Sequence, residues 1–175
     1  MEKLKIGLFW GSDTGNTDGI AVDMKKKLDP YFDIESHVMN KVNDKELFNQ
    51  YDYLIFGLST WYDGELQSDW EFFFEDFCTL DFTNKKVAIF GLGDQYGYGE
   101  WFCDGIGILG KQVIDKNGTL IGWWPTEGYE FDESKSVLKE NYFCGLPLDE
   151  DNQCELTEER IEKWTDQIKN EFLGN

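Results

Sequence analysis

The chain of 175 residues carries 16 lysines and arginines against 35 aspartates and glutamates, which gives a formal net charge of −19. So acidic a surface repels nucleic acid and anionic membranes, and it attracts a protein partner with a basic surface. Hydrophobic residues make up 41% of the chain and aromatic residues 17%, which suffices for one domain-sized core and excludes a disordered chain. An acidic surface can also serve only to keep a protein soluble, so the charge by itself does not identify a partner.

Short apolar runs predict buried strands along the chain. They are Leu4–Trp10, Tyr53–Leu58 and Val87–Leu92, with a weaker candidate at Phe32–Val38 and another strand that begins in Thr119–Trp123. No run approaches the roughly 20 apolar residues of a membrane-spanning helix, so we expect no membrane insertion. The first ten residues also lack the apolar core of a signal peptide, so we expect a cytoplasmic protein.

Amphipathic segments lie between the predicted strands, with apolar side chains that recur every three or four residues. Their apolar faces comprise Ile20, Met24 and Leu28; Trp70, Phe73, Phe74 and Phe77; Phe102, Ile106, Leu109 and Val113; and Ile161, Trp164, Ile168 and Phe172. Thr157 is predicted to cap the last helix, since Glu158 and Glu159 follow where the helix dipole favours acids. This alternation of strands and helices predicts an α/β fold, a parallel sheet with helices on both faces.

The segment Trp124–Phe143 breaks the alternation because it is polar and rich in turn residues. We interpret it as an excursion near the fifth strand rather than a second domain, so residues 1–175 are predicted to form a single domain. The four cysteines lack the spacing of a metal site and are predicted to be reduced thiols. The one histidine, His37, is predicted to have a structural or solvated role.

Ligands of a doubly wound sheet bind at the carboxyl ends of the strands, where the loops Gly11–Thr17, Ser59–Ser68 and Gly93–Glu100 follow predicted strands. The first loop offers hydroxyl groups, flexible glycines and the N–H groups of a helix N-terminus, which together favour an anion. It lacks the lysine of a nucleotide-hydrolysing loop and the dinucleotide-binding pattern, so it suits a terminal phosphate monoester. The same residue types are also ordinary in turns and helix caps.

The second and third loops each carry an aromatic residue in a polar setting. Trp61 is placed to stack on a planar ligand, or else to cap the sheet or fill a protein interface. Tyr98 is the second candidate ring, in a glycine-rich loop whose backbone can approach a ligand closely. Asp94 could orient a polar ring edge through its side chain or its backbone. Glycine-rich turns with tyrosines also occur on surfaces that bind nothing.

Taken together, the loops resemble the flavodoxin family. The matching segments are Ser12–Thr17, Ser59–Trp61 and Gly93–Tyr98, and their order and spacing agree. The acidic stretch Leu148–Gln153 and the excursion at Trp124–Phe143 resemble the long-chain branch of that family, which implies that the excursion interrupts the fifth strand. The resemblance covers nearly the whole chain. It implies a flavodoxin-like three-layer sandwich, with five parallel strands in the order 2-1-3-4-5 and FMN at their carboxyl edge, its phosphate held by Ser12–Thr17.

The resemblance also implies roles for single residues. Trp61 and Tyr98 would cover the two faces of the flavin ring. Backbone groups of Asp94 and Cys103 would meet its pyrimidine edge, and Asp151 would lie near the ribityl chain. The predicted cofactor-binding residues are Ser12, Asp13, Thr14, Gly15, Asn16, Thr17, Ser59, Thr60, Trp61, Tyr62, Asp63, Gly64, Gly93, Asp94, Tyr98, Cys103 and Asp151.

Two positions depart from the family pattern. Trp101 stands where many long-chain members carry a small amide side chain. The peptide between Tyr62 and Asp63 would face flavin N5 and respond to its protonation, but neither residue is glycine. A peptide flip there requires a positive φ from a non-glycine residue, which Asp tolerates better than most residues.

The resemblance implies an electron carrier rather than an enzyme, a low-potential protein that cycles FMN between semiquinone and hydroquinone. Rings over both flavin faces leave no room for a substrate to lie flat for hydride transfer, and the exposed edge suits one-electron transfer. The expected partners are redox proteins with basic docking surfaces, such as a flavoprotein NADPH reductase or photosystem I, and we expect a monomer.

Two other functions stay open at this point. An FMN-dependent reductase of quinones or azo compounds on the same fold would need an open flavin face, commonly completed by a dimer. A flavin-free signalling module such as a receiver domain would need acids around a phosphorylatable aspartate and a lysine beyond the fifth strand. We do not find that constellation in the sequence.

Overall fold

A parallel sheet forms the middle layer of the structure, a computed structural model that describes residues 2–175 and leaves Met1 outside the described residues. The main strands are β1 (Lys5–Trp10), β2 (Asp33–Val38), β3 (Tyr53–Trp61), β5 (Lys86–Leu92) and β6 (Thr119–Ile121). They lie in the order β2-β1-β3-β5-β6, and each neighbouring pair is parallel. Since β5 and β6 are the fourth and fifth main strands of the chain, the predicted order 2-1-3-4-5 is confirmed.

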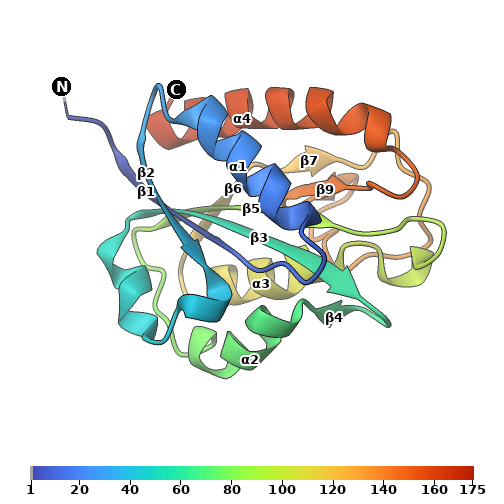
Figure 1. Ribbon diagram of the computed structural model, residues 1–175, viewed down its shortest axis with the longest axis horizontal. Coiled ribbons are helices and arrows are strands. Elements are labelled where there is room, and N and C mark those ends of the chain that lie inside the picture. The colour runs from blue at the N-terminus through green and yellow to red at the C-terminus, as the bar shows by residue number, and fades with distance from the viewer. Residues whose placement is uncertain (1) are drawn as a thin grey trace.

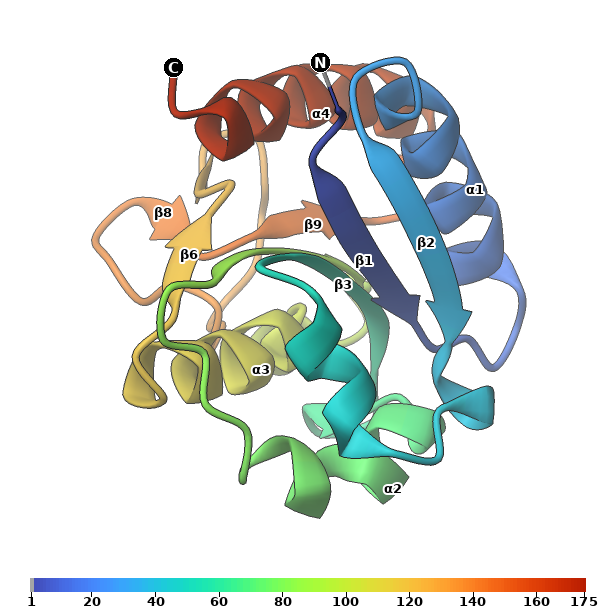
Figure 2. The same ribbon diagram turned by 90° about the vertical axis from the view of Figure 1, so that its left-hand side faces the viewer.

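Helices cover both faces of this sheet. They are α1 (Asn16–Leu28), α2 (Ser68–Phe77), α3 (Asp104–Asp115) and α4 (Thr157–Leu173). Figure 1 shows α1 and α4 above the sheet and α2 and α3 below it, and Figure 2 shows the same layers after a quarter turn. Side chains alternate between the two faces of a strand. In β1, Leu8 therefore packs with α1 and α4, while Phe9 packs with α2 and other residues of the opposite core.

The fifth main strand is divided into two pieces, β6 and β9 (Leu146–Leu148), which both pair with β5. Lys86–Ala88 of β5 pairs with β6, and Phe90–Leu92 of β5 pairs with β9. Residues 122–145 lie between these pieces and contain the antiparallel pair β7 (Trp124–Pro125) and β8 (Tyr142–Phe143). A short strand β4 (Glu65–Leu66) also folds back on the end of β3. Over residues 2–175 the sheet therefore counts seven strands instead of the five expected.

Several predicted boundaries are wrong for local reasons. β3 extends to Trp61 rather than Leu58, because β4 pairs with its last residues. α3 begins at Asp104 rather than Phe102, because Cys103 adopts a left-handed conformation with φ 51°. Thr157 does not cap α4, because its hydroxyl donates to the carboxylate of Glu150 instead.

Short 3₁₀ turns lie in the connections at Met39–Lys41, Lys45–Gln50, Gly99–Trp101 and Cys154–Leu156. His37 has a structural setting, because its Nε2 lies 2.7 Å from the hydroxyl of Tyr51 and its ring stacks on Phe9 at 4.7 Å. No helix of residues 2–175 combines the length and the apolar character that crossing a membrane requires.

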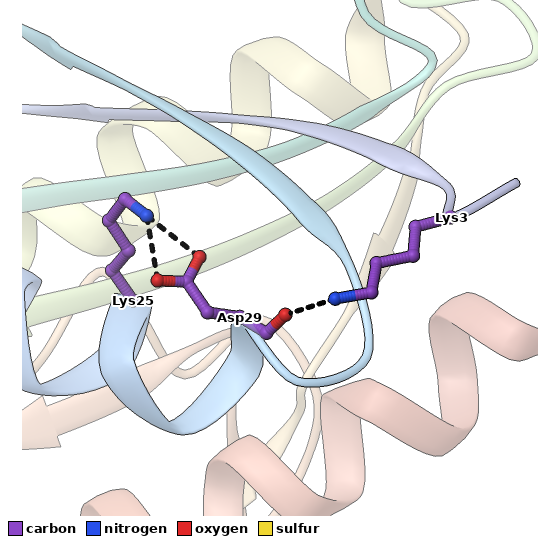
Figure 3. Close-up of polar contacts among 3 residues, drawn as sticks. All are labelled: Lys3, Lys25 and Asp29. Atoms are coloured by element: carbon purple, nitrogen blue, oxygen red, sulfur yellow. Dashed lines mark hydrogen bonds and ion pairs between the residues drawn. The ribbon is translucent and has the colours of Figure 1, made fainter.

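Lysines gather at the amino edge of the sheet, where α1 ends. The Nζ of Lys25 lies 2.7 and 2.8 Å from the two carboxylate oxygens of Asp29, and the Nζ of Lys3 donates to the Asp29 carbonyl at 2.7 Å (Figure 3). Lysines in the last turn of a helix also offset the negative end of its dipole. These contacts stabilise the end of α1 that lies opposite the loops at the carboxyl edge.

Candidate functional site

A cavity of about 360 Å³ lies at the carboxyl edge of the sheet, where the predicted loops meet. Its lining residues are Thr14, Asn16, Thr17, Ser59, Thr60, Trp61, Tyr62, Leu92, Gly93, Asp94, Tyr98, Glu150 and Asp151. Leu92 and Glu150 were missed in the sequence, although Glu150 belongs to the acidic stretch already singled out. A hollow of about 520 Å³ between α1 and α4 is larger, but charged helix side chains line it, so size alone does not locate the site.

The first wall of the cavity is the loop that leads into α1. Gly15 precedes the helix with φ 92°, a left-handed conformation that suits glycine, and it has no side chain with which to cap the helix. Its N–H donates to the hydroxyl of Ser12 at 2.9 Å, which closes the turn. The N–H groups of the first helical turn point toward this loop and carry partial positive charge. The wall can therefore bind an anion without a lysine or arginine.

Asp13 faces α2 rather than the cavity. Its carboxylate accepts hydrogen bonds from Ser68 Oγ at 2.6 Å and from Gln67 Nε2 at 3.0 Å. Gln67 is fully buried and also accepts a hydrogen bond from the N–H of Trp70 at 3.4 Å, near the start of α2. Asp13 thereby joins the first loop to the segment after β4.

The second wall is the turn between β3 and β4. Trp61 Nε1 donates to Ser59 Oγ at 2.8 Å, which orients the indole. Tyr62 is 63% exposed and has φ 47°, so the positive φ falls on the tyrosine and on Gly64 rather than on Asp63. A left-handed conformation in a bulky residue costs on the order of 1–3 kcal/mol and is typical of functional sites. Gly64 is required there, because a Cβ would lie 2.6 Å from an oxygen of Asp104.

The third wall is the loop after β5, which the side chain of Asp94 holds together. Its Oδ1 accepts hydrogen bonds from Tyr96 N at 3.0 Å, Gly97 N at 2.7 Å and Asn152 Nδ2 at 2.7 Å. Burial raises the pKa of the Asp94 carboxyl, but these hydrogen bonds outweigh it and leave that pKa below its usual value. With its side chain so engaged, Asp94 offers a ligand mainly its backbone. Tyr98 lies on the same loop and lines the cavity with a half-exposed ring.

Asp149, a buried residue missed in the sequence, joins the third loop to the acidic stretch. Its Oδ2 accepts hydrogen bonds from Gln95 N at 3.1 Å and Gln95 Nε2 at 2.7 Å, and its Oδ1 accepts from Asp151 N at 3.1 Å. This places Asp151 in the wall of the cavity. Burial and the nearby carboxylates of Asp94 and Asp149 raise the pKa of Asp151.

Some predicted site residues do not line the cavity. These are Ser12, Asp13, Gly15, Asp63, Gly64 and Cys103. The thiol of Cys103 is fully buried beneath the third loop, where a Cβ on Gly93 would lie 2.7 Å from its Sγ, and burial raises its pKa. The backbone carbonyl of Cys103 accepts a hydrogen bond from Ser136 Oγ at 2.5 Å. Trp101 lines a different hollow, together with Asp104 and Phe131.

Charge around the cavity is of one sign, because the loops 11–17, 59–68 and 93–100 contain no lysine or arginine. Across residues 2–175, no group of three or more histidine, cysteine or acidic side chains is arranged to hold a metal ion. The arrangement can therefore bind a planar ligand with an anionic tail, but it offers no cation to a negative charge on the ring.

A protein-family model described as "Flavodoxin" matches residues 8–164. The chain belongs to the flavodoxin family. The flavodoxin of Haemophilus influenzae is 48% identical over 169 residues, which cover 95% of both chains. The flavodoxin of Synechocystis is 50% identical over 167 residues, which cover 94% of this chain and 96% of the relative.

Solved structures agree with this family assignment. The crystal structure of Fusobacterium nucleatum flavodoxin bound to flavin mononucleotide superposes with a TM-score of 0.88 at 35% identity, over 95% of this chain and 98% of that chain. The resemblance to flavodoxins and the flavodoxin-like fold are thus confirmed.

Proposed function

We propose that this flavodoxin carries single electrons on one non-covalently bound FMN in the cavity at the carboxyl edge of the sheet. The observation that carries the proposal is the pairing, in one cavity, of an uncapped helix N-terminus with two aromatic rings, Trp61 and Tyr98. The volume of about 360 Å³ falls within the roughly 300–1,000 Å³ typical of small-molecule sites. As a member of its family, the chain is an electron-transfer protein rather than an enzyme.

The phosphate of FMN would bind at the first loop, to residues of Ser12–Thr17. The geometry supports this because Thr14, Asn16 and Thr17 line the cavity beside the start of α1. Hydroxyl groups and backbone N–H groups suit a phosphate, and the helix dipole adds to their effect. Asp13 would contribute by its hydrogen bonds to α2, which fix the loop, rather than by touching the phosphate.

The flavin ring would lie between Trp61 and Tyr98, with Ser59, Thr60 and the backbone of Gly93 beneath its edge. The Asp94 and Cys103 backbones would meet the pyrimidine, and Asp151 the ribityl chain. The left-handed Tyr62 supports a role for the Tyr62–Asp63 peptide beside flavin N5, since a strained backbone in the wall of a cavity is typical of functional sites. Gly64 would support this turn from behind, since the lack of a Cβ lets it pack against Asp104.

Replacement of Trp61 by alanine should weaken FMN binding about tenfold, and it should restore part of the flavin fluorescence that the indole quenches. A stacked ring contributes about 0.5–1.5 kcal/mol beyond the area that it buries, and tenfold in affinity corresponds to about 1.4 kcal/mol. Titration of the apoprotein with FMN measures both effects. Trp123→Ala is the control, since that indole lies outside the cavity. Emission still fully quenched in Trp61→Ala would remove Trp61 from the site.

The partners of the chain are redox proteins, and we propose that they present basic docking surfaces, as a flavoprotein NADPH reductase or photosystem I would. The net charge of −19 and the absence of lysine and arginine from the three loops support this proposal. We further propose that the chain acts as a monomer in the cytoplasm, where its four free cysteines would stay reduced.

Electron transfer to a basic redox protein should fall as salt is added, because screening shortens to about 8 Å at physiological ionic strength. Overly tight docking at low salt can itself slow turnover, so a maximum at intermediate salt agrees with the same account. Stopped-flow rates at several ionic strengths measure the dependence. A rate that stays constant throughout would show that the acidity serves only solubility.

A further inference from the structure

Phe72, on α2, is exposed to solvent over 92% of its surface, more than any other large hydrophobic side chain of residues 2–175. Its neighbours on the helix behave differently, because Phe73 and Phe77 are buried in the core. A single exposed hydrophobic residue is ordinary, whereas one beside other apolar groups marks an interaction site. The surroundings of Phe72 therefore decide whether its exposure indicates an interaction site.

Phe72 forms one side of a hollow of about 660 Å³ that adjoins the proposed FMN cavity. The apolar part of this hollow consists of Trp61, Tyr62, Leu66 and Phe72, and acidic side chains of Asp13, Glu65 and Glu71 stand around it. Trp61 and Tyr62 line both spaces, so the two sites share a wall. Figure 1 shows the end of β3, β4 and the start of α2 together at this corner of the molecule.

The charge around the hollow is entirely negative. The sequence has no lysine or arginine between Lys45 and Lys85, a stretch that includes β3, β4 and α2. An apolar centre within a rim of carboxylates complements an apolar side chain within a rim of lysines or arginines. These carboxylates would repel an acidic partner. A wholly apolar partner would remove water from them and offer no positive charge in exchange.

We propose that this hollow, the Phe72 hollow, anchors an apolar or aromatic side chain that a redox partner presents within a ring of basic residues. The inference rests on the proposed function and adds to it a docking point beside the flavin rather than over it. An anchored side chain would touch Trp61 and Tyr62, which also line the proposed FMN cavity. Docking there would place the partner's surface against the wall that the two spaces share.

The test uses the FMN-loaded, fully reduced protein and mitochondrial cytochrome c, a basic haem protein, as the probe. Stopped-flow rates that saturate with cytochrome c concentration give the dissociation constant of the complex. Phe72→Ser should raise that constant about tenfold, and the increase should persist at high salt because it comes from lost apolar contact. Phe72→Leu, which keeps an apolar side chain, should recover most of the affinity. Glu71→Gln should weaken binding at low salt only.

The matched control is Tyr31→Ser, which removes an exposed ring at the opposite, amino edge of the sheet and should leave the constant unchanged. FMN content and flavin quenching should be unaffected in all of these variants, which shows that each is folded and loaded. Wild-type affinity in Phe72→Ser at every salt concentration would overturn the inference while leaving the proposed function intact.

Two further outcomes would also overturn it. A wild-type protein that sediments as a dimer, with a monomeric Phe72→Ser variant, would place a second copy of this chain on the Phe72 hollow. A wild-type protein that binds no FMN, or that transfers no electrons to cytochrome c, would overturn the proposed function together with this inference.

Discussion

Riboflavin should bind this chain at least a hundredfold more weakly than FMN. The two ligands differ only in the phosphate, and a hydrogen bond to a charged group contributes about 1.5–3 kcal/mol. Two such bonds from the first loop amount to roughly 3–6 kcal/mol, or about a hundredfold to ten-thousandfold in affinity. The first-turn N–H groups of α1 and the hydroxyls of Thr14 and Thr17 provide at least that many donors beside the cavity.

Titrations of the apoprotein with both ligands measure this ratio directly. Thr17→Val, which keeps the volume of a buried side chain and removes its hydroxyl, should weaken FMN binding and leave riboflavin binding almost unchanged. Thr60→Val is the comparison, because its hydroxyl lines the cavity at the second loop and bonds to the N–H of Gly105 instead. Equal affinities for FMN and riboflavin would show that this loop does not hold the phosphate.

The second one-electron reduction of bound FMN should occur well below the potential of the same step in free FMN. Full reduction places a negative charge on the flavin ring, and the three loops provide no lysine or arginine to offset it. They provide Asp63, Glu65, Asp94 and Glu100 instead, and Asp151 also lines the cavity. The electron-rich rings of Trp61 and Tyr98, which we propose to cover the flavin faces, would oppose the same charge.

The expected size follows from Coulomb's law. At an effective dielectric constant of about 20, a unit charge at about 10 Å costs roughly 1.7 kcal/mol before salt screening. For a one-electron couple, this corresponds to on the order of 70 mV per charge. Solvent reduces the contribution of exposed carboxylates, but several of them act with the same sign, so the total stays large.

Neutralising variants test this origin of the low potential. Asp151→Asn should raise the second potential by tens of millivolts, and Glu140→Gln, which lies outside the cavity in the excursion, should change it far less. Since burial and two carboxylates raise the pKa of Asp151, this side chain begins to gain its proton at a higher pH than an ordinary aspartate. The contribution of Asp151 to the low potential should therefore fade as the pH decreases through that pKa. Equal shifts of the second potential in Asp151→Asn and Glu140→Gln would contradict this origin of the low potential.

The sequence predicted the layers and the edge of the sheet at which the candidate cavity lies, because both depend on local patterns. Apolar runs such as Val87–Leu92 give strands, and a parallel arrangement of those strands brings Thr17, Trp61 and Tyr98 to one edge. The exposure of Phe72 could also have been predicted from the sequence, since Phe72 lies off the apolar face formed by Trp70, Phe73 and Phe77.

What the sequence did not predict depends on contacts between distant segments. Thr157 looks like a helix cap, but Glu150 competes successfully for its hydroxyl. The Asp149 side chain accepts hydrogen bonds from Gln95, which lies 54 residues away along the chain, and no local pattern indicates that partnership. The left-handed conformation of Tyr62 likewise follows from the pairing of β3 with β4, and not from the residue itself.

The most direct test of the electron-carrier function is a reductive titration of the FMN-loaded protein, with absorbance and potential recorded together. We expect two separate one-electron steps, with a blue, one-electron-reduced flavin that accumulates between them and a second potential well below that of free FMN. A single two-electron bleaching, with no blue species and a potential near that of free FMN, would contradict the account and favour a reductase.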